Sequence, residues 1–448
     1  MNSIQKKRKL KKTAGFFSMK NKHQKSVSKN SSQNERKSGM KMKTWEEIRD
    51  DFPILKETIN NQPLIYLDNA ATTQIPKQVM DCWVEHYTKY NGNVHRGIHT
   101  LAELSTSHME AVREKVLNFL NAKELGQIVF TSGATDSANL VAQSFLKHRL
   151  KPGDIVLSTE LEHHANYVVW QQLCLECGAQ FQVIPTIDGD LDLEAAEKMI
   201  SENVKFFATT AVSNVLGTVV DIRKLIGLAK KYEIPVFIDA AQALRHESFD
   251  LASLDCDFLG FSAHKMMGPT GVGCLFIRDK WLDEMKPWRY GGGMVDIVKE
   301  ESTSFADVPA RLEAGTPNYS GIIAFGAAID YLSAIGFSRI FEREEELTAQ
   351  AEKLLREIPE VTVLGNPGRR AGVLSIFVDG VHPYDLASFI DKFGVAVRTG
   401  SMCAQPIVRK YGAETVTRIS PAFYNTPEEL KQAVETLKIV IALIKQAK

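Results

Sequence analysis

One lysine, Lys265, stands in a sequence context that suggests a reactive amine in a pocket. Lys265 follows an apolar segment and precedes a glycine-rich turn, in FLGFSAHKMMGPTGVGC. A buried lysine loses its proton readily, and its neutral amine can form a Schiff base with an aldehyde. Asp239 ends another apolar segment, PVFID, 26 residues earlier. A buried carboxylate is costly unless a cation meets it, so the pair predicts a pocket for an aldehyde cofactor with a cationic ring.

Two segments could supply hydrogen-bond donors for a phosphate group. In VFTSGATDSAN, Ala134 and Thr135 stand between an apolar segment and a helical pattern, where backbone N–H groups at a helix start favour phosphate. Any tight turn from a strand into a helix favours the same residue types, so this segment alone is weak evidence. Ser262 and His264 precede Lys265 and add two further donors.

A histidine pair follows another apolar segment, DIVLST. Adjacent residues point in different directions, so His163 and His164 do not form a chelating pair. His163 is predicted to lie over a planar ligand or to carry a proton; the alternative is a polar helix start. Asp239 has a comparable alternative as a helix N-cap. The lysine, the acid and the phosphate donors, taken together and in this order, predict a pyridoxal phosphate site without a metal.

A thiol and two arginines stand out nearer the C-terminus. GVAVRTGSMCAQP places Cys403 on a short loop after a strand. Buried cysteines are usually inert, whereas a loop thiol near cations is more acidic and more nucleophilic. Arg418, in TVTRISPAF, is predicted to bind a substrate carboxylate with its planar fork, and Arg398 has the same potential. The alternative for both arginines is a surface ion pair.

The elements that must position these residues alternate in type. Seven apolar segments predict buried strands: LIYLD, QIVFTS, DIVLST, QFQVIP, KFFATTAV, PVFIDAA and DFLGFSA. Helical patterns separate several of them, which predicts an α/β fold with a mostly parallel seven-stranded sheet covered on both faces. Ligands bind beyond the carboxyl ends of such strands, where the residues described above are placed.

Composition suits a protein of more than one domain: 448 residues, 44% hydrophobic and 24% charged. Residues 1–43 hold 14 Lys and Arg against one acid and predict a disordered basic tail. We expect residues 44–63 to pack with a small domain and 64–318 to form the large domain. Residues 319–448 are predicted to form the smaller C-terminal α/β domain, which carries the Cys403 loop and closes on a capped helix at NTPEEL.

Several classes of protein are disfavoured. Six cysteines are too sparse for a disulfide scaffold and favour a reducing compartment, so we expect a cytoplasmic location. Import into an organelle is less consistent with the sequence, since transit peptides favour Arg and this tail is rich in Lys. Cys174 and Cys177 are predicted to pack in a helix that ends at Gly178 rather than to bind zinc. No apolar run is long enough for a membrane span, and lysines alone predict no specific nucleic-acid binding.

From about residue 45 onward, the chain resembles the SufS-type (group II) cysteine desulfurases of the class V aminotransferase family, which are fold-type I pyridoxal phosphate enzymes. The resemblance rests on segments that span the folded region in order: YLDNAATTQ, VHRGIHTL, LEHHANYVVWQ, VSNVLGT, IDAAQA, SAHKMMGPTGVG, EAGTPN and VRTGSMCAQP.

The resemblance implies a role for each site residue. Lys265 would hold the cofactor, with Asp239 at the ring nitrogen, His163 on the ring face, and Gln242 and Asn214 near the phenolic oxygen. The phosphate ligands would be Ala134, Thr135, Ser262 and His264, joined by Thr316 from the neighbouring subunit of a homodimer. The residues near the substrate would be Arg418, Arg398, His95 and Asn214.

The implied reaction converts L-cysteine to L-alanine and leaves a persulfide on Cys403. An acceptor protein would then carry the sulfur to an iron–sulfur scaffold. Two histidines usually precede this cysteine in the family, and Ser401 and Met402 stand there instead; Ala211 likewise replaces a common histidine. Tyr384 replaces a histidine of the branch that uses a zinc-bearing, SufU-like acceptor, which favours a SufE-like acceptor.

Other functions stay open at this stage. A selenocysteine lyase shares the fold and the cysteine, and another lyase or transaminase of the class V family could carry the cysteine incidentally. A nucleic-acid or scaffold-binding protein led by its basic tail is a different class, and it predicts that removal of residues 1–41 abolishes function.

Overall fold

The computed structural model of the protein describes residues 42–247 and 249–447. The predicted disordered tail therefore lies almost entirely outside the described residues. Residues 44–448 form one unit, within which the predicted boundaries at residues 63 and 318 stay a prediction.

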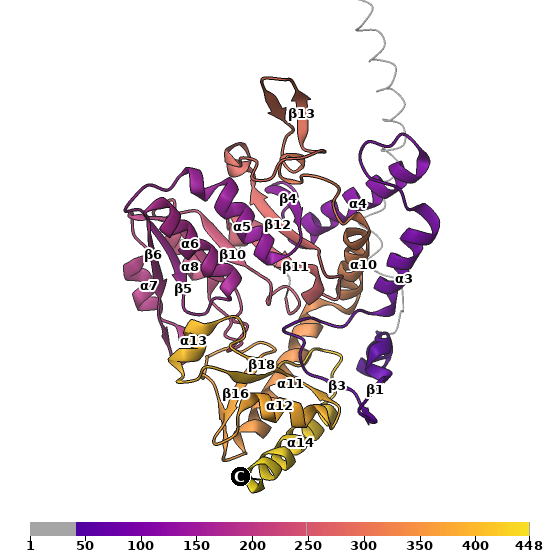
Figure 1. Ribbon diagram of the computed structural model, residues 1–448, viewed down its shortest axis with the longest axis vertical. Helices are drawn as coiled ribbons and strands as arrows, with labels where there is room; N and C mark the ends of the chain where they lie inside the picture. The colour runs from indigo at the N-terminus through magenta and orange to yellow at the C-terminus, as the bar shows by residue number, and fades with distance from the viewer. Residues whose placement is uncertain (1–41, 248, 448) are drawn as a thin grey trace, which may run out of the picture. The chain divides into compact units, whose positions relative to one another are not determined.

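A seven-stranded sheet forms the centre of this unit (Figure 1). Its spatial order is β4 (Gly126–Thr131), β12 (Gly273–Arg278), β11 (Phe258–Ser262), β10 (Val236–Asp239), β9 (Val204–Thr210), β5 (Ile155–Thr159) and β6 (Gln180–Ile184). Only β12 runs against its two neighbours, and the other pairings are parallel. The predicted α/β class and mostly parallel sheet are confirmed.

Both faces of this sheet are buried, because successive side chains along each strand enter different hydrophobic clusters. On β9, Phe206 packs with α5 (Ala134–Ser144) and α6 (Val168–Cys177), whereas Phe207 packs on the opposite face. That face is covered by α4 (Thr100–Phe119), α8 (Ile222–Lys230) and α10 (Tyr319–Ile335). Near-continuous apolar strands are typical of a sheet covered on both sides.

Two strands differ from the sequence-based expectation. Residues 64–68 do not join the large sheet: β3 (Ile65–Tyr66) pairs in parallel with β17 (Val395–Ala396). The seventh strand is instead β12, which inserts between β4 and β11. An apolar run predicts burial, but the strand that it pairs with depends on tertiary contacts that no local pattern encodes.

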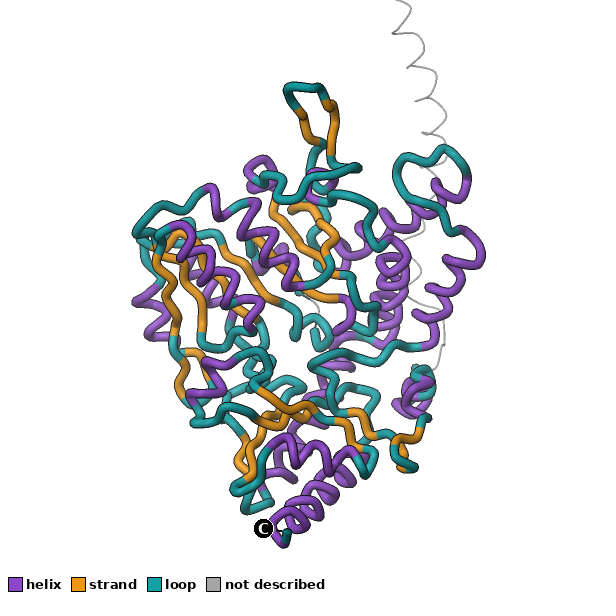
Figure 2. Tube along the Cα trace, viewed as in Figure 1, coloured by secondary structure: helices purple, strands orange, loops and turns teal. Residues whose placement is uncertain are grey.

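A second, antiparallel sheet lies beside the large one and is seen below it in Figure 2. Its order is β15 (Val361–Val363), β16 (Leu374–Val378), β19 (Val416–Ile419) and β18 (Arg398–Gly400). It packs with α11 (Phe337–Arg356), α12 (Pro383–Asp391) and α14 (Pro427–Gln446) around its own hydrophobic cluster. The predicted capping box of α14 is present, with Thr426 and Glu429 bonded reciprocally.

The remaining elements are shorter or peripheral. The helices are α2 (Trp45–Arg49), α3 (Lys77–Glu85), α7 (Leu193–Met199), α9 (Leu251–Leu254) and α13 (Gln405–Lys410). Strands of two to four residues form three hairpins in the described part of the chain. They are β1 (Thr58–Ile59) with β2 (Gln62–Pro63), β7 (Thr186–Ile187) with β8 (Asp190–Leu191), and β13 (Val295–Val298) with β14 (Thr303–Phe305).

Helix α10 ends where Gly336 adopts a φ of 93°. The predicted single helical stretch is therefore two helices, α10 and α11, bent by 78°. Among the described residues, no single helix is long and apolar enough to cross a membrane, and only this bent pair passes by length and composition. Most of α10 is buried in the core of the protein. The predicted helix with Cys174 and Cys177 is α6, which ends at Gly178 in the left-handed conformation.

Candidate active site

The predicted site residues follow strands that end at one edge of the large sheet. β4, β5, β9, β10 and β11 run in the same direction, so their carboxyl ends lie together. Asp239 is the last residue of β10, and Lys265 lies in the 3-10 turn Ala263–Lys265 that follows β11. Ala134 opens α5 directly after β4.

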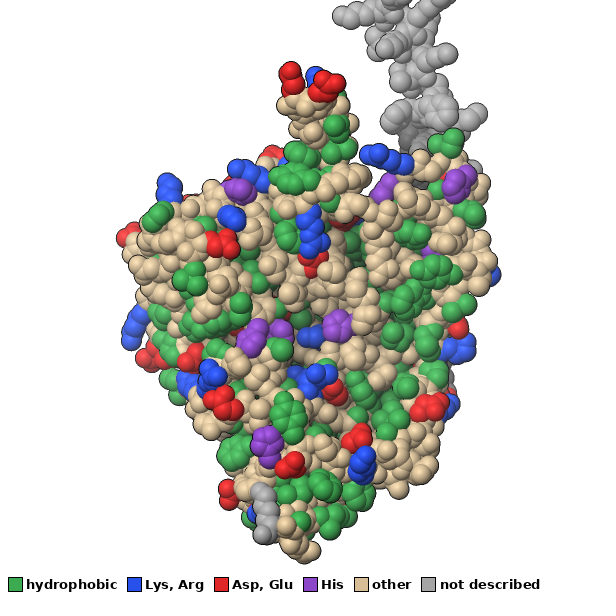
Figure 3. Space-filling model, viewed as in Figure 1, with side chains coloured by type: hydrophobic (Ala, Val, Ile, Leu, Met, Phe, Trp, Pro, Cys, Tyr) green, Lys and Arg blue, Asp and Glu red, His purple; other side chains and the backbone are tan. Residues whose placement is uncertain are grey.

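Two pockets that share wall residues lie at this edge. The outer one has a volume of about 500 Å³ and is lined by the predicted residues Thr135, His163, Asn214, Gln242, His264, Lys265, Arg398, Cys403 and Arg418. The inner one, of about 40 Å³, adds Ala134 and Asp239. Figure 3 shows His, Lys and Arg side chains gathered across the middle of the face in view. The fold thus brings eleven of the fourteen predicted residues to one cavity.

Burial governs the charge state of the lysine and the acid. Burial lowers the pKa of Lys265 to about 8, while nearby Asp239 acts in the opposite direction. Burial also raises the pKa of Asp239, which a hydrogen bond from the Ala241 N–H (2.9 Å) to Oδ1 opposes. Asp239 therefore caps the turn that follows β10, and its role toward a cationic ring stays a prediction. A neutral amine at Lys265 is accessible near physiological pH.

The two histidines are held neutral. Burial lowers the pKa of His163 to about 3, and that of His264 to about 4, with Lys265 adding to both effects. His163 Nδ1 accepts a hydrogen bond from the Ala165 N–H at 3.0 Å. Its single proton is therefore assigned to Nε2, which can donate it. His163 also caps the short 3-10 turn His164–Asn166, as its alternative interpretation predicts.

Two side-chain amides leave buried oxygens without a partner in the described part of the chain. Gln242 donates from Nε2 to the Ala70 carbonyl at 2.7 Å, and Asn214 donates from Nδ2 to the Met402 carbonyl at 2.6 Å. Gln242 Oε1 and Asn214 Oδ1 accept no hydrogen bond. Buried polar atoms are rarely unsatisfied, so both oxygens indicate a polar ligand in the cavity.

The end of the cavity near α5 depends on glycine. Ser262 Oγ accepts a hydrogen bond from the Ala134 N–H at 2.8 Å, which joins β11 to the start of α5. Gly133 precedes this point with a φ of 154°, and a Cβ on Gly273 would lie 2.4 Å from the Gly133 Cα. Only glycine at both positions allows this close approach of β12 to the turn.

The loop that carries Cys403 has an unusual backbone. Met402 and Cys403 both have positive φ angles, 53° and 52°, which non-glycine residues rarely adopt. Asn214 holds the Met402 carbonyl, and the His164 N–H donates to the Cys403 carbonyl at 2.6 Å. The Met402 side chain is buried in the core, while Cys403 is exposed at the pocket. Anchors on both sides therefore keep the thiol in a strained but fixed position.

Both predicted carboxylate-binding arginines contact Asp68. Arg418 is buried and donates from Nη2 to Asp68 Oδ1 at 3.2 Å and from Nη1 to the Asn214 carbonyl at 3.1 Å. Arg398, half exposed, forms an ion pair with Asp68 Oδ2 at 3.0 Å. Burial lowers the pKa of Arg418 to about 10. Both arginines form ion pairs, as their alternative interpretation predicts, although Arg418 is buried rather than at the surface; their binding of a substrate carboxylate stays a prediction.

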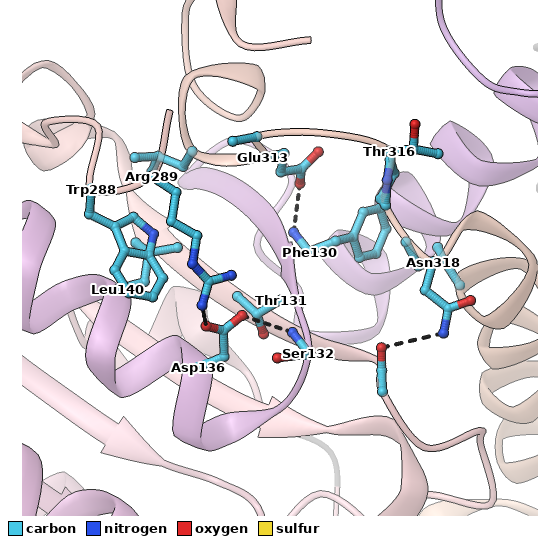
Figure 4. Close-up of a pocket in the computed structure, with 15 residues that line it drawn as sticks. Phe130, Thr131, Ser132, Asp136, Leu140, Trp288, Arg289, Glu313, Thr316 and Asn318 are labelled. Atoms are coloured by element: carbon cyan, nitrogen blue, oxygen red, sulfur yellow. Dashed lines mark hydrogen bonds and ion pairs between the residues drawn. The ribbon is translucent and has the colours of Figure 1, made fainter. Parts of the chain in front are cut away.

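Two predicted residues lie away from this cavity. Thr316 lines a separate pocket of about 260 Å³ with Ser132, Asp136 and Arg289 (Figure 4). His95 is exposed, with its N–H donating to Thr106 Oγ1 at 2.8 Å. Their predicted contacts with cofactor and substrate stay predictions. Over residues 42–247 and 249–447, no three His, Cys, Asp or Glu side chains converge as metal ligands.

Three residues of the site were missed from the sequence. Asp68 follows an apolar segment, which is the signal that identified Asp239. His164 binds the cysteine loop twice, because its Nε2 also accepts from the Gln405 N–H at 3.1 Å. Glu162 is buried behind the site and accepts from the Thr210 N–H, the Thr159 hydroxyl and the Asn166 amide at 2.9, 2.6 and 2.6 Å. No local pattern shows the contacts of His164 and Glu162.

Comparisons with known proteins agree with this geometry. The aminotransferase class-V family model matches residues 65–433. A cysteine desulfurase of Salmonella agona is 43% identical over 401 residues, which cover 89% of this chain and 98% of that protein. Among solved structures, the apo cysteine desulfurase of Thermococcus onnurineus superposes with a TM-score of 0.85 at 37% identity, over 91% of this chain and all of that one. The cysteine desulfurase CsdA of Escherichia coli, in its S-sulfonic acid form, has a TM-score of 0.83 at 32% identity, over 90% of this chain and 100% of that one.

Proposed function

The chain belongs to the aminotransferase class-V family, and from that membership we propose that it is a pyridoxal phosphate-dependent cysteine desulfurase. It would convert L-cysteine to L-alanine and retain the sulfur on Cys403. The observation that carries this proposal is the convergence of five side chains on one cavity of about 500 Å³: the amine of Lys265, the amides of Asn214 and Gln242, the guanidinium of Arg418 and the thiol of Cys403.

The residues present fit the cofactor. Gln242 Oε1 and Asn214 Oδ1 are buried polar atoms with no partner among the residues that the structure describes, and both residues line the inner pocket together with Asp239. Lys265 would hold the cofactor, Asp239 would face its ring nitrogen, and Ser262 with the start of α5 would hold its phosphate. When bound, pyridoxal phosphate supplies an aldehyde for an amine and a ring that withdraws electrons from the substrate α-carbon.

The protein's own residues would bind the substrate and move its protons. Arg418 binds the α-carboxylate, because a buried guanidinium pairs strongly with an anion. Lys265, with its pKa lowered to about 8, exchanges a proton at Nζ near neutral pH. Neutral His163 presents the proton on Nε2 to the cavity. Anchored by its loop, Cys403 receives the sulfur.

The sulfur transfer balances without an external oxidant. The thiolate of Cys403 forms an S–S bond with the substrate sulfur while the Cβ–S bond of that substrate breaks. The electron pair of the broken bond stays on carbon, which is protonated to give the methyl group of alanine. Sulfur is transferred in the zero-valent state, so Cys403 ends as a persulfide.

Partners follow from the same proposal. A group II enzyme of this kind passes sulfur to a thiol acceptor, here of the SufE-like kind, for iron–sulfur cluster assembly; exposed Tyr384 at the pocket rim supports that choice over a zinc-bearing acceptor. A homodimer is supported by large apolar side chains exposed on and near α3 and α4: Val84, Tyr87, Ile98, Leu101 and Leu104. The cytoplasm would keep the exposed thiol reduced.

The test is incubation of the cofactor-loaded protein with L-cysteine while alanine and the Cys403 persulfide are quantified. Cys403→Ala should abolish alanine formation from cysteine, whereas Cys177→Ala, a half-buried thiol in α6, should retain it. If Cys403→Ala still releases selenium from selenocysteine at the wild-type rate, while neither protein turns over cysteine, the enzyme is a selenocysteine lyase. Removal of residues 1–41 should leave turnover near normal.

A further inference from the structure

Two cations that line the cavity, Arg398 and Arg418, share one anion, Asp68. Asp68 receives Arg398 on both of its oxygens, since Arg398 Nε lies 3.1 Å from Oδ1 and from Oδ2, and Nη2 lies 3.0 Å from Oδ2. Arg418 gives Asp68 a single contact of 3.2 Å, and its buried Nε has no partner among the described residues. The fork of Arg398 is therefore engaged, while Arg418 keeps donor capacity for a ligand.

Backbone pairing fixes this trio in place. Arg398 and Arg418 are directly opposite each other on β18 and β19, so their side chains leave the sheet on the same face. Asp68 is bridged to Ser420, and its neighbour Leu67 exchanges backbone hydrogen bonds with both the β17 segment and Ser420. These contacts hold the backbone of Asp68 beside the two arginines, and their guanidinium groups hold its carboxylate.

The charge balance indicates what Asp68 does. Within the trio, one positive charge remains uncompensated, which is what the α-carboxylate of an amino acid would neutralise. Asp68 itself presents the same chemical group to the same guanidinium that the proposed function assigns to the substrate. A fixed negative charge next to that position repels an incoming carboxylate and also occupies an Nη donor of Arg418.

We propose that Asp68 is an internal competitor of the substrate α-carboxylate, which lowers the affinity of the site for amino acids. The proposal rests on the proposed function, because it needs a ligand with that group. L-cysteine and L-alanine carry the same α-carboxylate, so tight binding of this group would retain the substrate and the product alike. Uniform binding of that kind does not speed the chemical step and slows product release. Asp68 thereby keeps alanine from accumulating in the site.

The same geometry gives different roles to Arg398 and Arg418. Arg398 serves to hold Asp68 and is a positioning residue, whereas Arg418 binds the substrate. The sequence alone assigned both residues the same role.

The experiment measures binding of L-alanine to the cofactor-loaded protein by titration calorimetry, with L-alaninamide as the analogue whose carboxylate is replaced by a neutral amide. Asp68→Asn should lower the Kd for L-alanine about tenfold, which is about 1.4 kcal/mol, and leave that for L-alaninamide unchanged. The KM for L-cysteine should fall in parallel, and alanine should become a stronger inhibitor. Asp385→Asn is the matched control, because it removes one exposed acid next to Tyr384, which lines the cavity, and should change neither Kd.

A second variant keeps the test decisive if an unpaired Arg398 prevents folding of Asp68→Asn. Asp68→Asn combined with Arg398→Gln has the net charge of the wild type and removes the ion pair as a whole. We expect it to bind L-alanine at least as tightly as the wild type does. Weaker binding of L-alanine by either variant overturns the proposal, since it would mean that Asp68 or Arg398 assists the ligand. If wild-type protein binds neither L-cysteine nor L-alanine, the proposed function fails first and this inference falls with it.

Discussion

The amine of Lys265 gives a quantitative test of the electrostatics of the site. Burial lowers its pKa to about 8, against roughly 10.4 for an unperturbed lysine. At pH 7, about one molecule in ten would then carry a neutral amine, compared with roughly one in 2,500 without the shift. The neutral amine is the reactive form, so the structure predicts a gain of about two orders of magnitude in the reactive fraction.

The assay is pulse acylation of the cofactor-free protein between pH 6 and 11, followed by digestion and mass spectrometry. The acylation rate of Lys265 should rise about tenfold per pH unit and level off near pH 8, whereas the rates of exposed lysines in the same digest should keep rising above pH 10. Because burial also slows access of the reagent, the midpoint of each profile is compared rather than the absolute rate.

Substitution of Asp239 should shift the pH midpoint of Lys265 acylation in the same assay. Its carboxylate favours the charged form of Lys265, so Asp239→Asn should move the midpoint below that of the wild type. Asp257→Asn is the control: Asp257 is another buried acid, but it precedes β11 at the opposite edge of the sheet and binds Trp281. A wild-type midpoint at or above pH 10, or an upward shift in Asp239→Asn, would refute the reasoning.

Three other predictions concern stability and the cysteine loop. The pKa of Lys265 is lower in the folded protein than in the unfolded chain, so between about pH 8 and 10.4 the folded apoprotein binds fewer protons than the unfolded chain does. Its free energy of unfolding should therefore rise with pH across that window by up to about 3 kcal/mol. Denaturant titrations of Lys265→Met should lack that rise. His164→Ala removes the hydrogen bond to the Gln405 N–H, worth about 1 kcal/mol, so hydrogen exchange at Gln405 should accelerate and kcat should fall more than KM rises. Glu162→Gln places an N–H2 group against the Asn166 amide or the Thr210 N–H; because burial raises the pKa of Glu162 to about 8, the free energy of unfolding should fall by about 1–3 kcal/mol in denaturant titrations above pH 8, where the wild-type carboxyl group is ionised. Unchanged exchange at Gln405, or unchanged stability in Glu162→Gln, would contradict the respective argument.

The location of the site could be predicted from the sequence because parallel strands impose a common edge. Once four apolar segments were identified as parallel strands, the residues that follow them had to meet: Ala134, His163, Asp239 and Lys265. Arg418 and Cys403 come from the second sheet, and their place at the cavity depended on residue chemistry and on the family resemblance. This inference needs only that the strands run parallel, which the alternation of apolar segments with helical patterns predicts.

What the sequence could not give are the contacts between distant segments. β12 was not among the predicted strands, and its insertion into the large sheet rests on its pairing with β4, more than 140 residues earlier. Residues 65–66 were placed in the wrong sheet because their partner is β17, more than 300 residues later. The role of Asp68 was missed because it depends on contacts with Arg398 and Arg418, which strand pairing places beside each other.

The cysteine loop shows how the structure accommodates a departure from the family pattern. Met402 stands where the family usually has a histidine, and its side chain is buried in the hydrophobic core rather than directed to the thiol. An apolar side chain in that position anchors the left-handed backbone of Met402 and Cys403 by packing, which a charged imidazole could not do without a buried partner. The imidazole near Cys403 is instead provided by His164, from the end of β5 on the large sheet, and it binds the loop through both its backbone and its ring. Met402 anchors the loop by packing and His164 by polar contacts, so the position of the thiol depends on how the second sheet docks against the first.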